Sequence, residues 1–300
     1  MNQIPIGLLS DSTGKLLLEK YQLHYVNSTR DLLSAQATAT SKSAVLLGNP
    51  KFDLVASAQN AATSPAQSPA SQRGVDIWGG PLPPLPGTEE EVTTIDKLLR
   101  QSGWQTTLYT GDRALKTSIQ RVQAPRIVHI ATHGFFLEDQ PAPDKSGRIV
   151  RLQGATDDPM LHSGLLFAGA DRARSGTAPA GSDNGVLTAY EASQLNLEGT
   201  ELVVLSACET GLGGQSNSEG VFGLRRALQE AGASAVMMSL WSVPDKETQE
   251  LMALFYKYWL GGLEKPEALR KAQLEEREVV RKRYGQDLPY YWGAFVMVSR

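Results

Sequence analysis

Cysteine is nearly absent from this chain, whose 300 residues include only Cys208. One thiol cannot form a disulfide within the chain, and it cannot build a cysteine-based zinc site. Because an unpaired cysteine suits a reducing compartment, we expect the protein in the cytoplasm. Cys208 is then either a small buried hydrophobic residue, the commonest role of a lone cysteine, or a reactive thiol.

The chain also lacks an excess of charge of one sign and a long apolar run. Lys and Arg number 29 and Asp and Glu 32, which gives a net charge of −3. This balance argues against a binder of nucleic acid or of an anionic membrane, because phosphate binding needs clustered positive charge. The longest apolar run, residues 232–243, is shorter than the ~20 residues of a membrane span, and no secretory pattern opens the chain. We therefore expect no nucleic-acid partner and no membrane association.

What the sequence does contain is an alternation of two kinds of segment. Continuous apolar runs typical of buried strands alternate with amphipathic segments typical of helices. The expected strands are 43–50, 104–112, 126–134, 200–211, 233–243 and 292–299, and the expected helices are 87–103, 114–123, 219–232, 246–262 and 265–285. This order predicts an α/β fold, a three-layer α/β/α sandwich around a mostly parallel sheet.

Two stretches interrupt the alternation. Residues 56–73 and 138–185 are rich in small, polar, Gly and Pro residues, and we expect mobile loops there. Within the second stretch, the run MLHSGLLFAGA is too apolar for a loop. We expect it to lie on the core as a short ordered piece.

Two of the expected strands end on reactive side chains. One finishes at His133 and Gly134, and the other at Cys208 followed by Glu-Thr-Gly. The carboxyl ends of parallel strands are where sites collect, so the imidazole and the thiol meet if these strands are neighbours. An imidazole beside a thiol raises the thiolate fraction, and the glycines let backbone N–H groups approach a reacting carbonyl. On this placement we favour a nucleophile with its base over a buried, inert thiol.

Other chemistries fit the sequence less well. His129 and His133 are four residues apart, but on a strand this spacing separates their side chains by ~13 Å, too far to share a metal. His129 is therefore expected to be a packed or supporting residue. A cysteine phosphatase needs an Arg about six residues after the cysteine, where this chain has Gly214, and no Walker lysine is present. We expect no metal and no cofactor.

Several longer motifs give the sequence a family resemblance. In order along the chain they are LPGTEEEV, HIATHG, LHSGLLFAGA, NGVLTAYEASQLNL, LVVLSACETGLG, EGVFGLRRALQEAGASAVMMSLWSVPD and YYWGAFVMVS. Together they resemble the CHAT domain, a caspase-like cysteine peptidase of the clan of caspases, separase and gingipain. The resemblance covers nearly the whole chain and implies the caspase–haemoglobinase fold, with one domain over residues 1–300. CHAT domains are often attached to tetratricopeptide repeats and switched by a partner, so this chain could be the C-terminal part of a longer protein with a regulatory partner or attached repeat domain.

The resemblance also implies roles for individual residues. His133 matches the catalytic histidine and Cys208 the nucleophile, as a dyad that needs no third acid, and the N–H groups of Gly134 and Cys208 match the oxyanion hole. LWSVPDKET resembles a stretch of separase in which the acid at the position of Asp245 lines the pocket for the residue before the scissile bond. Ser242 and Val243 would then offer backbone to an extended substrate. An Asp before KETQELM is equally expected to cap the following helix.

These expectations lead to a cysteine endopeptidase that cleaves a protein or peptide substrate after Arg or Lys. One alternative is a catalytically silent binding module that holds a peptide or partner in the same groove, and another is a thiol-dependent acyltransferase or hydrolase of small esters. A basic-specific pocket and a substrate-like loop further suggest self-cleavage after Arg148, Arg151, Arg172 or Arg174.

Overall fold

The centre of the molecule is a seven-stranded sheet in the order β1-β10-β9-β8-β4-β2-β3. The computed structural model describes residues 5–28, 41–54, 81–136, 159–161, 163–174, 183–206 and 218–300. The strands are β1 (Tyr25–Val26), β2 (Ser43–Pro50), β3 (Gln105–Gly111), β4 (Ile127–Ala131), β8 (Leu202–Leu205), β9 (Ala235–Ser239) and β10 (Phe295–Ser299). Every neighbouring pair is parallel except β9 and β10. The predicted mostly parallel sheet is therefore confirmed.

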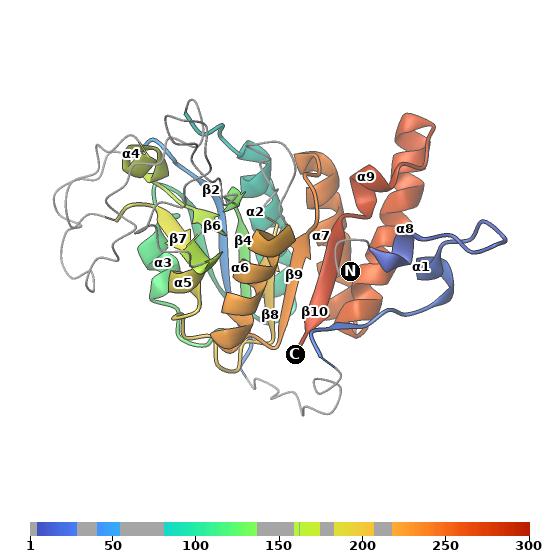
Figure 1. Cartoon of the computed structure of the whole chain (residues 1–300), viewed down its shortest axis with the longest axis horizontal. Coiled ribbons are helices and arrows are strands. Elements are labelled where there is room, and N and C mark those ends of the chain that lie inside the picture. The colour runs from blue at the N-terminus through green and yellow to red at the C-terminus, as the bar shows by residue number, and fades with distance from the viewer. Residues whose placement is uncertain are drawn as a thin grey trace, which may run out of the picture.

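Helices cover both faces of this sheet (Figure 1). One face packs against α2 (Pro86–Gln101), α7 (Asp245–Leu260) and α8 (Lys265–Tyr284), and the other against α3 (Lys116–Gln120) and α6 (Ser218–Glu230). Successive strand residues divide between the two cores: Val203 belongs to the α6 side and Val204 to the α2 side, and both are fully buried. Burial on both faces explains why the strand sequences are continuously apolar. The predicted three-layer α/β/α architecture is confirmed.

A second, smaller sheet was not predicted from the sequence. It is antiparallel and contains β5 (Gly134–Phe136), β6 (Ser163–Leu166) and β7 (Val186–Thr188), with the short helices η5 (Pro159–Leu161), α4 (Ala170–Arg174) and α5 (Ala189–Ala192) beside it. Figure 1 shows it at the end of the molecule away from α8. Residues 163–166 of the apolar run that we expected to lie on the core form β6 and are buried, as predicted. Strands this short carry too few residues for an alternation to be recognised.

The two expected loops lie mainly outside the described residues. The stretch 56–73 is wholly outside, and so are Arg148 and Arg151 in the second stretch. Arg172 and Arg174, by contrast, belong to α4. A helix must unwind before a protease can hold it in extended form, so these two arginines fit the self-cleavage hypothesis less well than we expected.

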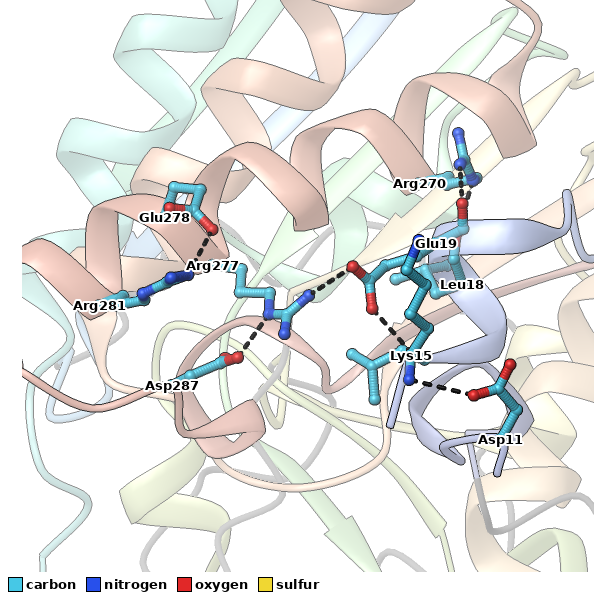
Figure 2. A network of polar contacts seen from close by, with 10 residues as sticks. Asp11, Lys15, Leu18, Glu19, Arg270, Arg277, Glu278, Arg281 and Asp287 are labelled. Atoms are coloured by element: carbon cyan, nitrogen blue, oxygen red, sulfur yellow. Dashed lines mark hydrogen bonds and ion pairs between the residues drawn. The ribbon is translucent and has the colours of Figure 1, made fainter. Parts of the chain in front are cut away.

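The N-terminal segment is fastened to the C-terminal half of the chain. The η1 helix (Ile6–Leu8) and α1 (Leu17–Lys20) share a hydrophobic cluster with α8 and α9 (Pro289–Trp292), and β1 pairs with β10. Figure 2 shows two arginines of α8 that make the connection. Arg270 donates to the carbonyl oxygens of Leu18 (2.7 Å) and Glu19 (3.0 Å), and Arg277 joins the carboxylates of Glu19 (3.3 Å) and Asp287 (2.6 Å). Among the described residues, no helix has the length and apolar character to cross a membrane.

Candidate active site

The two strands that carry the predicted dyad are neighbours in the sheet. β4 and β8 pair in parallel, with Ile130 opposite Leu205, and Ser206 N–H donates to the Ile130 carbonyl at 3.0 Å. His133 follows Ile130 by three residues, and Cys208 follows Leu205 by the same number. The condition that we set for a shared site, adjacent strands in parallel register, is therefore met. Cys208 itself and the Glu-Thr-Gly after it lie outside the described residues.

His133 is held firmly at the carboxyl end of β4. Its side chain is buried, its ring stacks on Phe52 with centroids 5.1 Å apart, and its carbonyl accepts the N–H of Leu166 at 2.9 Å. The ring Nε2 donates to the carbonyl oxygen of Pro83 at 2.9 Å. A carbonyl can only accept, so this bond fixes the proton on Nε2 and leaves Nδ1 as the basic nitrogen. In the part of the chain that the structure describes, Nδ1 is buried without a hydrogen-bond partner.

The surroundings of His133 favour its neutral form. Burial lowers the pKa of His133 because the charged imidazolium loses hydration, and the Pro83 carbonyl and the charges of Asp245 and Asp171 oppose this effect only in part. The imidazole is then uncharged at neutral pH. It is a side chain in the state that a general base requires.

Asp245 lies close to His133, but it does not cap a helix. It is the first residue of α7, and no side-chain hydrogen bond caps this helix in the described structure, so the capping prediction is wrong. Its side chain is partly exposed and packs against Gly87, where an added Cβ would lie 2.6 Å from the Cβ of Asp245. Partial burial and the charge of Glu91 raise the pKa of the Asp245 carboxyl, against a smaller opposing effect of His133.

A small cavity lies between the first turns of α2 and α7 and the ends of β4 and β8. Glu91 enters it from α2, Asp245 and Thr248 from α7, and Thr132 and Ser206 from the strand ends. Within the described residues the hydroxyl groups of Ser206 and Thr248 are buried and have no hydrogen-bond partner. The cavity thus contains two unpaired hydroxyl groups together with two carboxylates. Leaving a buried hydroxyl unpaired lowers the stability of the fold.

Glu91 is held in this cavity by a buried hydrogen-bond chain. Its Oε1 accepts from Nε2 of His129 at 2.8 Å, and the His129 Nδ1 lies 3.2 Å from the hydroxyl of Tyr256. All three side chains are almost completely buried. His129 is thus the packed, supporting residue that we predicted. Glu91 was not among the predicted site residues and is an additional residue of the site.

The remaining predicted site residues occupy suitable places, but their roles remain predictions. Gly134 begins β5 directly after His133, and its pairing partner in β6 is Leu165. Ser242 is exposed and Val243 is buried, and both lie between the end of β9 and the start of α7. Since β9 is the neighbour of β8, this segment leaves the sheet at the same edge as Ser206.

Comparison with known proteins identifies the family. A family model described as the CHAT domain matches residues 1–300. The chain belongs to the CHAT domain family. Tetratricopeptide repeat protein 28 of Homo sapiens is 26% identical to this CHAT domain over 99% of the chain and 11% of that protein. The corresponding protein of Mus musculus is 24% identical, over 99% of the chain and 12% of its own length. The chain therefore spans about a tenth of the length of these curated relatives.

Two solved structures also resemble the CHAT domain at low identity. The Arg-specific cysteine proteinase gingipain R matches with a TM-score of 0.43 and 11% identity, over 92% of this chain and 49% of that chain. A complex of the RgpB pro- and mature domains of Porphyromonas gingivalis matches with a TM-score of 0.44 and 11% identity, over 92% of this chain and 50% of that chain.

Proposed function

We propose that this CHAT domain is a cysteine endopeptidase in which His133 is the general base for the thiol of Cys208. The observation that supports this most is the state of the imidazole: Nε2 is engaged by the Pro83 carbonyl, and Nδ1 is buried and unpaired. Cys208 follows Ser206 by two residues, a length of chain that spans at most about 7 Å. A thiol within that reach of the neighbouring strand can give its proton to Nδ1.

The proposed reaction has two halves. Nδ1 of His133 takes the thiol proton of Cys208, and the sulfur attacks the scissile carbonyl carbon while the N–H groups of Gly134 and Cys208 stabilise the oxyanion. His133 returns the proton to the departing amine as the C–N bond breaks, which leaves a thioester on Cys208. Water, deprotonated by the same imidazole, then hydrolyses the thioester and restores the thiol.

The cavity beside His133 supports a preference for a basic residue before the scissile bond. Asp245 and Glu91 both line it, and the charge of Glu91 raises the pKa of the Asp245 carboxyl. The positive charge of an arginine or lysine side chain at the opening of this cavity would compensate both carboxylates. Ser242 and Val243 would hold the substrate backbone in extended form.

The proposal places the protein in a reducing compartment, the cytoplasm, where Cys208 stays a free thiol. Its substrate is a protein or peptide. A regulatory partner or an attached repeat domain would control access to the site.

The test is cleavage of a fluorogenic peptide library at neutral pH under reducing conditions. Wild type is compared with Cys208→Ala and His133→Ala, and with Arg226→Ala as a control in an exposed ion pair on α6. Cleavage after Arg or Lys that both active-site variants lose and the control keeps would support the proposal. If wild type and variants are all inactive with every peptide and also after addition of candidate partners, while Cys208→Ala still captures a peptide, the chain is a binding module and the endopeptidase proposal fails.

A further inference from the structure

The Pro83 carbonyl, which accepts the hydrogen bond from Nε2–H of His133, belongs to no helix or strand. Residues 81–85 connect two parts of the chain without regular secondary structure, so something outside the segment must hold this acceptor in place. The contact that holds it is made by the neighbouring residue, Leu82. The N–H of Leu82 donates to the carboxylate of Asp171, with its nitrogen 3.1 Å from Oδ1 and 3.3 Å from Oδ2.

Asp171 is also connected to His133 through Phe52. Its own N–H donates to the carbonyl oxygen of Phe52 at 3.1 Å, and the Phe52 ring is the one that stacks on the imidazole. The side chains of Leu82, Phe52 and Leu166 belong to one small buried cluster around this point. One residue of α4 thus contacts both segments that fix the orientation of the imidazole, the one that accepts its proton and the one that covers its face.

The negative charge of Asp171 also acts on His133. Two carboxylates influence His133, Asp171 from α4 and Asp245 from α7, and both partly oppose the effect of burial on its pKa. The carboxylate of Asp171 therefore acts on His133 through its charge as well as through Leu82 and Phe52.

We propose that Asp171 is a positioning residue of the site, which holds the Pro83 carbonyl against Nε2 of His133 and so keeps Nδ1 free to take the proton of Cys208. The proposal rests on the proposed function for its purpose, but the positioning itself can be measured without any activity. A shortage of histidines makes this practical, because the chain has four: His24, His129, His133 and His162.

The experiment is NMR of protein labelled with ¹⁵N in its histidine rings, with the His133 signals assigned from His133→Gln. Wild type should show His133 as the Nε2–H tautomer. In Asp171→Ala we expect a mixture of tautomers, whereas Asp171→Asn, which keeps a neutral acceptor, should retain the Nε2–H form and lower the pKa of His133. The matched control is Asp183→Ala, since that carboxylate likewise accepts backbone N–H groups, those of Thr117 and Gly185 at 2.9 Å each, instead of that of Leu82.

An unchanged tautomer and titration of His133 in folded Asp171→Ala would overturn the proposal, as would an equal change in Asp183→Ala. If Asp171→Ala does not fold, hydrogen exchange in the wild-type protein still tests the proposal. The amide of Leu82 should be protected from hydrogen exchange, and exchange as fast as in an unstructured peptide would refute its bond to Asp171.

Activity separates this inference from the proposed function. In an enzyme that cleaves peptides, Asp171→Ala should lower kcat more than it changes KM, and Asp171→Asn should recover part of the loss. Absence of cleavage by wild type with the tautomer intact would reject the endopeptidase and leave the role of Asp171 standing. Cleavage by wild type with the tautomer unchanged in Asp171→Ala would support the endopeptidase and reject the role of Asp171.

Discussion

Gly87→Ala tests whether the close approach of α2 and α7 builds the proposed pocket. A Cβ at residue 87 would have Asp245 as its nearest neighbour, at 2.6 Å from Cβ, 2.8 Å from Oδ2 and 3.0 Å from Cγ. Neither Cβ can rotate away, so the first turns of the helices must separate, and overpacking of this kind costs about 3 kcal/mol at the upper end of its range. Alanine gains up to about 1 kcal/mol over glycine in helix propensity. We expect a net destabilisation of about 2 kcal/mol.

A double-mutant cycle measured by urea denaturation isolates the clash. In an Asp245→Gly background the three nearest atoms are removed, so Gly87→Ala should there be neutral or stabilising by up to about 1 kcal/mol. The coupling free energy between the two positions should then be about 3 kcal/mol. Equal effects of Gly87→Ala in both backgrounds, or no loss of stability beside Asp245, would refute the reasoning. On peptides, Gly87→Ala should weaken cleavage after Arg and Lys, because it displaces the carboxylate at the mouth of the pocket.

Three further predictions concern specificity, pH and self-cleavage. Asp245→Asn and Glu91→Gln should each lower kcat/KM for Arg and Lys peptides about 10- to 100-fold, the equivalent of one charge-assisted hydrogen bond of about 1.5–3 kcal/mol, and equal losses on uncharged peptides would contradict a specificity role. Because burial lowers the pKa of His133 below 6.5, the unfolded chain binds this proton more readily, and the unfolding free energy should fall as pH drops below that value. His133→Gln should flatten this slope in urea denaturation between pH 7 and pH 5, and an unchanged slope would show that other groups cause it. Prolonged incubation of the cleaving enzyme should give fragments that end at Arg148 or Arg151, and an unchanged intact mass would end that hypothesis.

The sequence predicted those parts of the fold that local pattern determines. Runs such as Leu202–Leu205 are apolar throughout because both faces of the sheet are covered, and this property is visible without any knowledge of their neighbours. The rim position of His133 follows from the end of its strand. The sequence did not predict that β4 and β8 are neighbours; the shared site was expected only if they were, because no local pattern encodes which strands pair.

The supporting groups of the site could not be predicted for a different reason. The acceptor of the His133 proton is the backbone carbonyl of Pro83, and a backbone atom leaves no mark on residue identity. Asp171 lies 89 residues from Leu82, the residue that it holds, within a stretch whose composition is typical of a loop. Asp245 was expected equally as a cap and as a pocket acid, because an Asp before a helix has the same sequence signature in both roles. Only the position of the helix start, which lies at Asp245 itself, separates the two.

The fastening of the chain's two ends has a consequence for the order of folding. β1 and β10 come from opposite ends of the sequence, so their pairing closes a very long loop and carries a large entropic cost. We expect the central strands to assemble first and the β1–β10 edge to form last. Until β10 pairs, the apolar strand Ala235–Ser239 is an open sheet edge, the kind of surface through which partly folded chains associate. Arg270 and Arg277 of α8 bind the N-terminal segment and so help to hold β1 against β10 once the rest of the domain has formed.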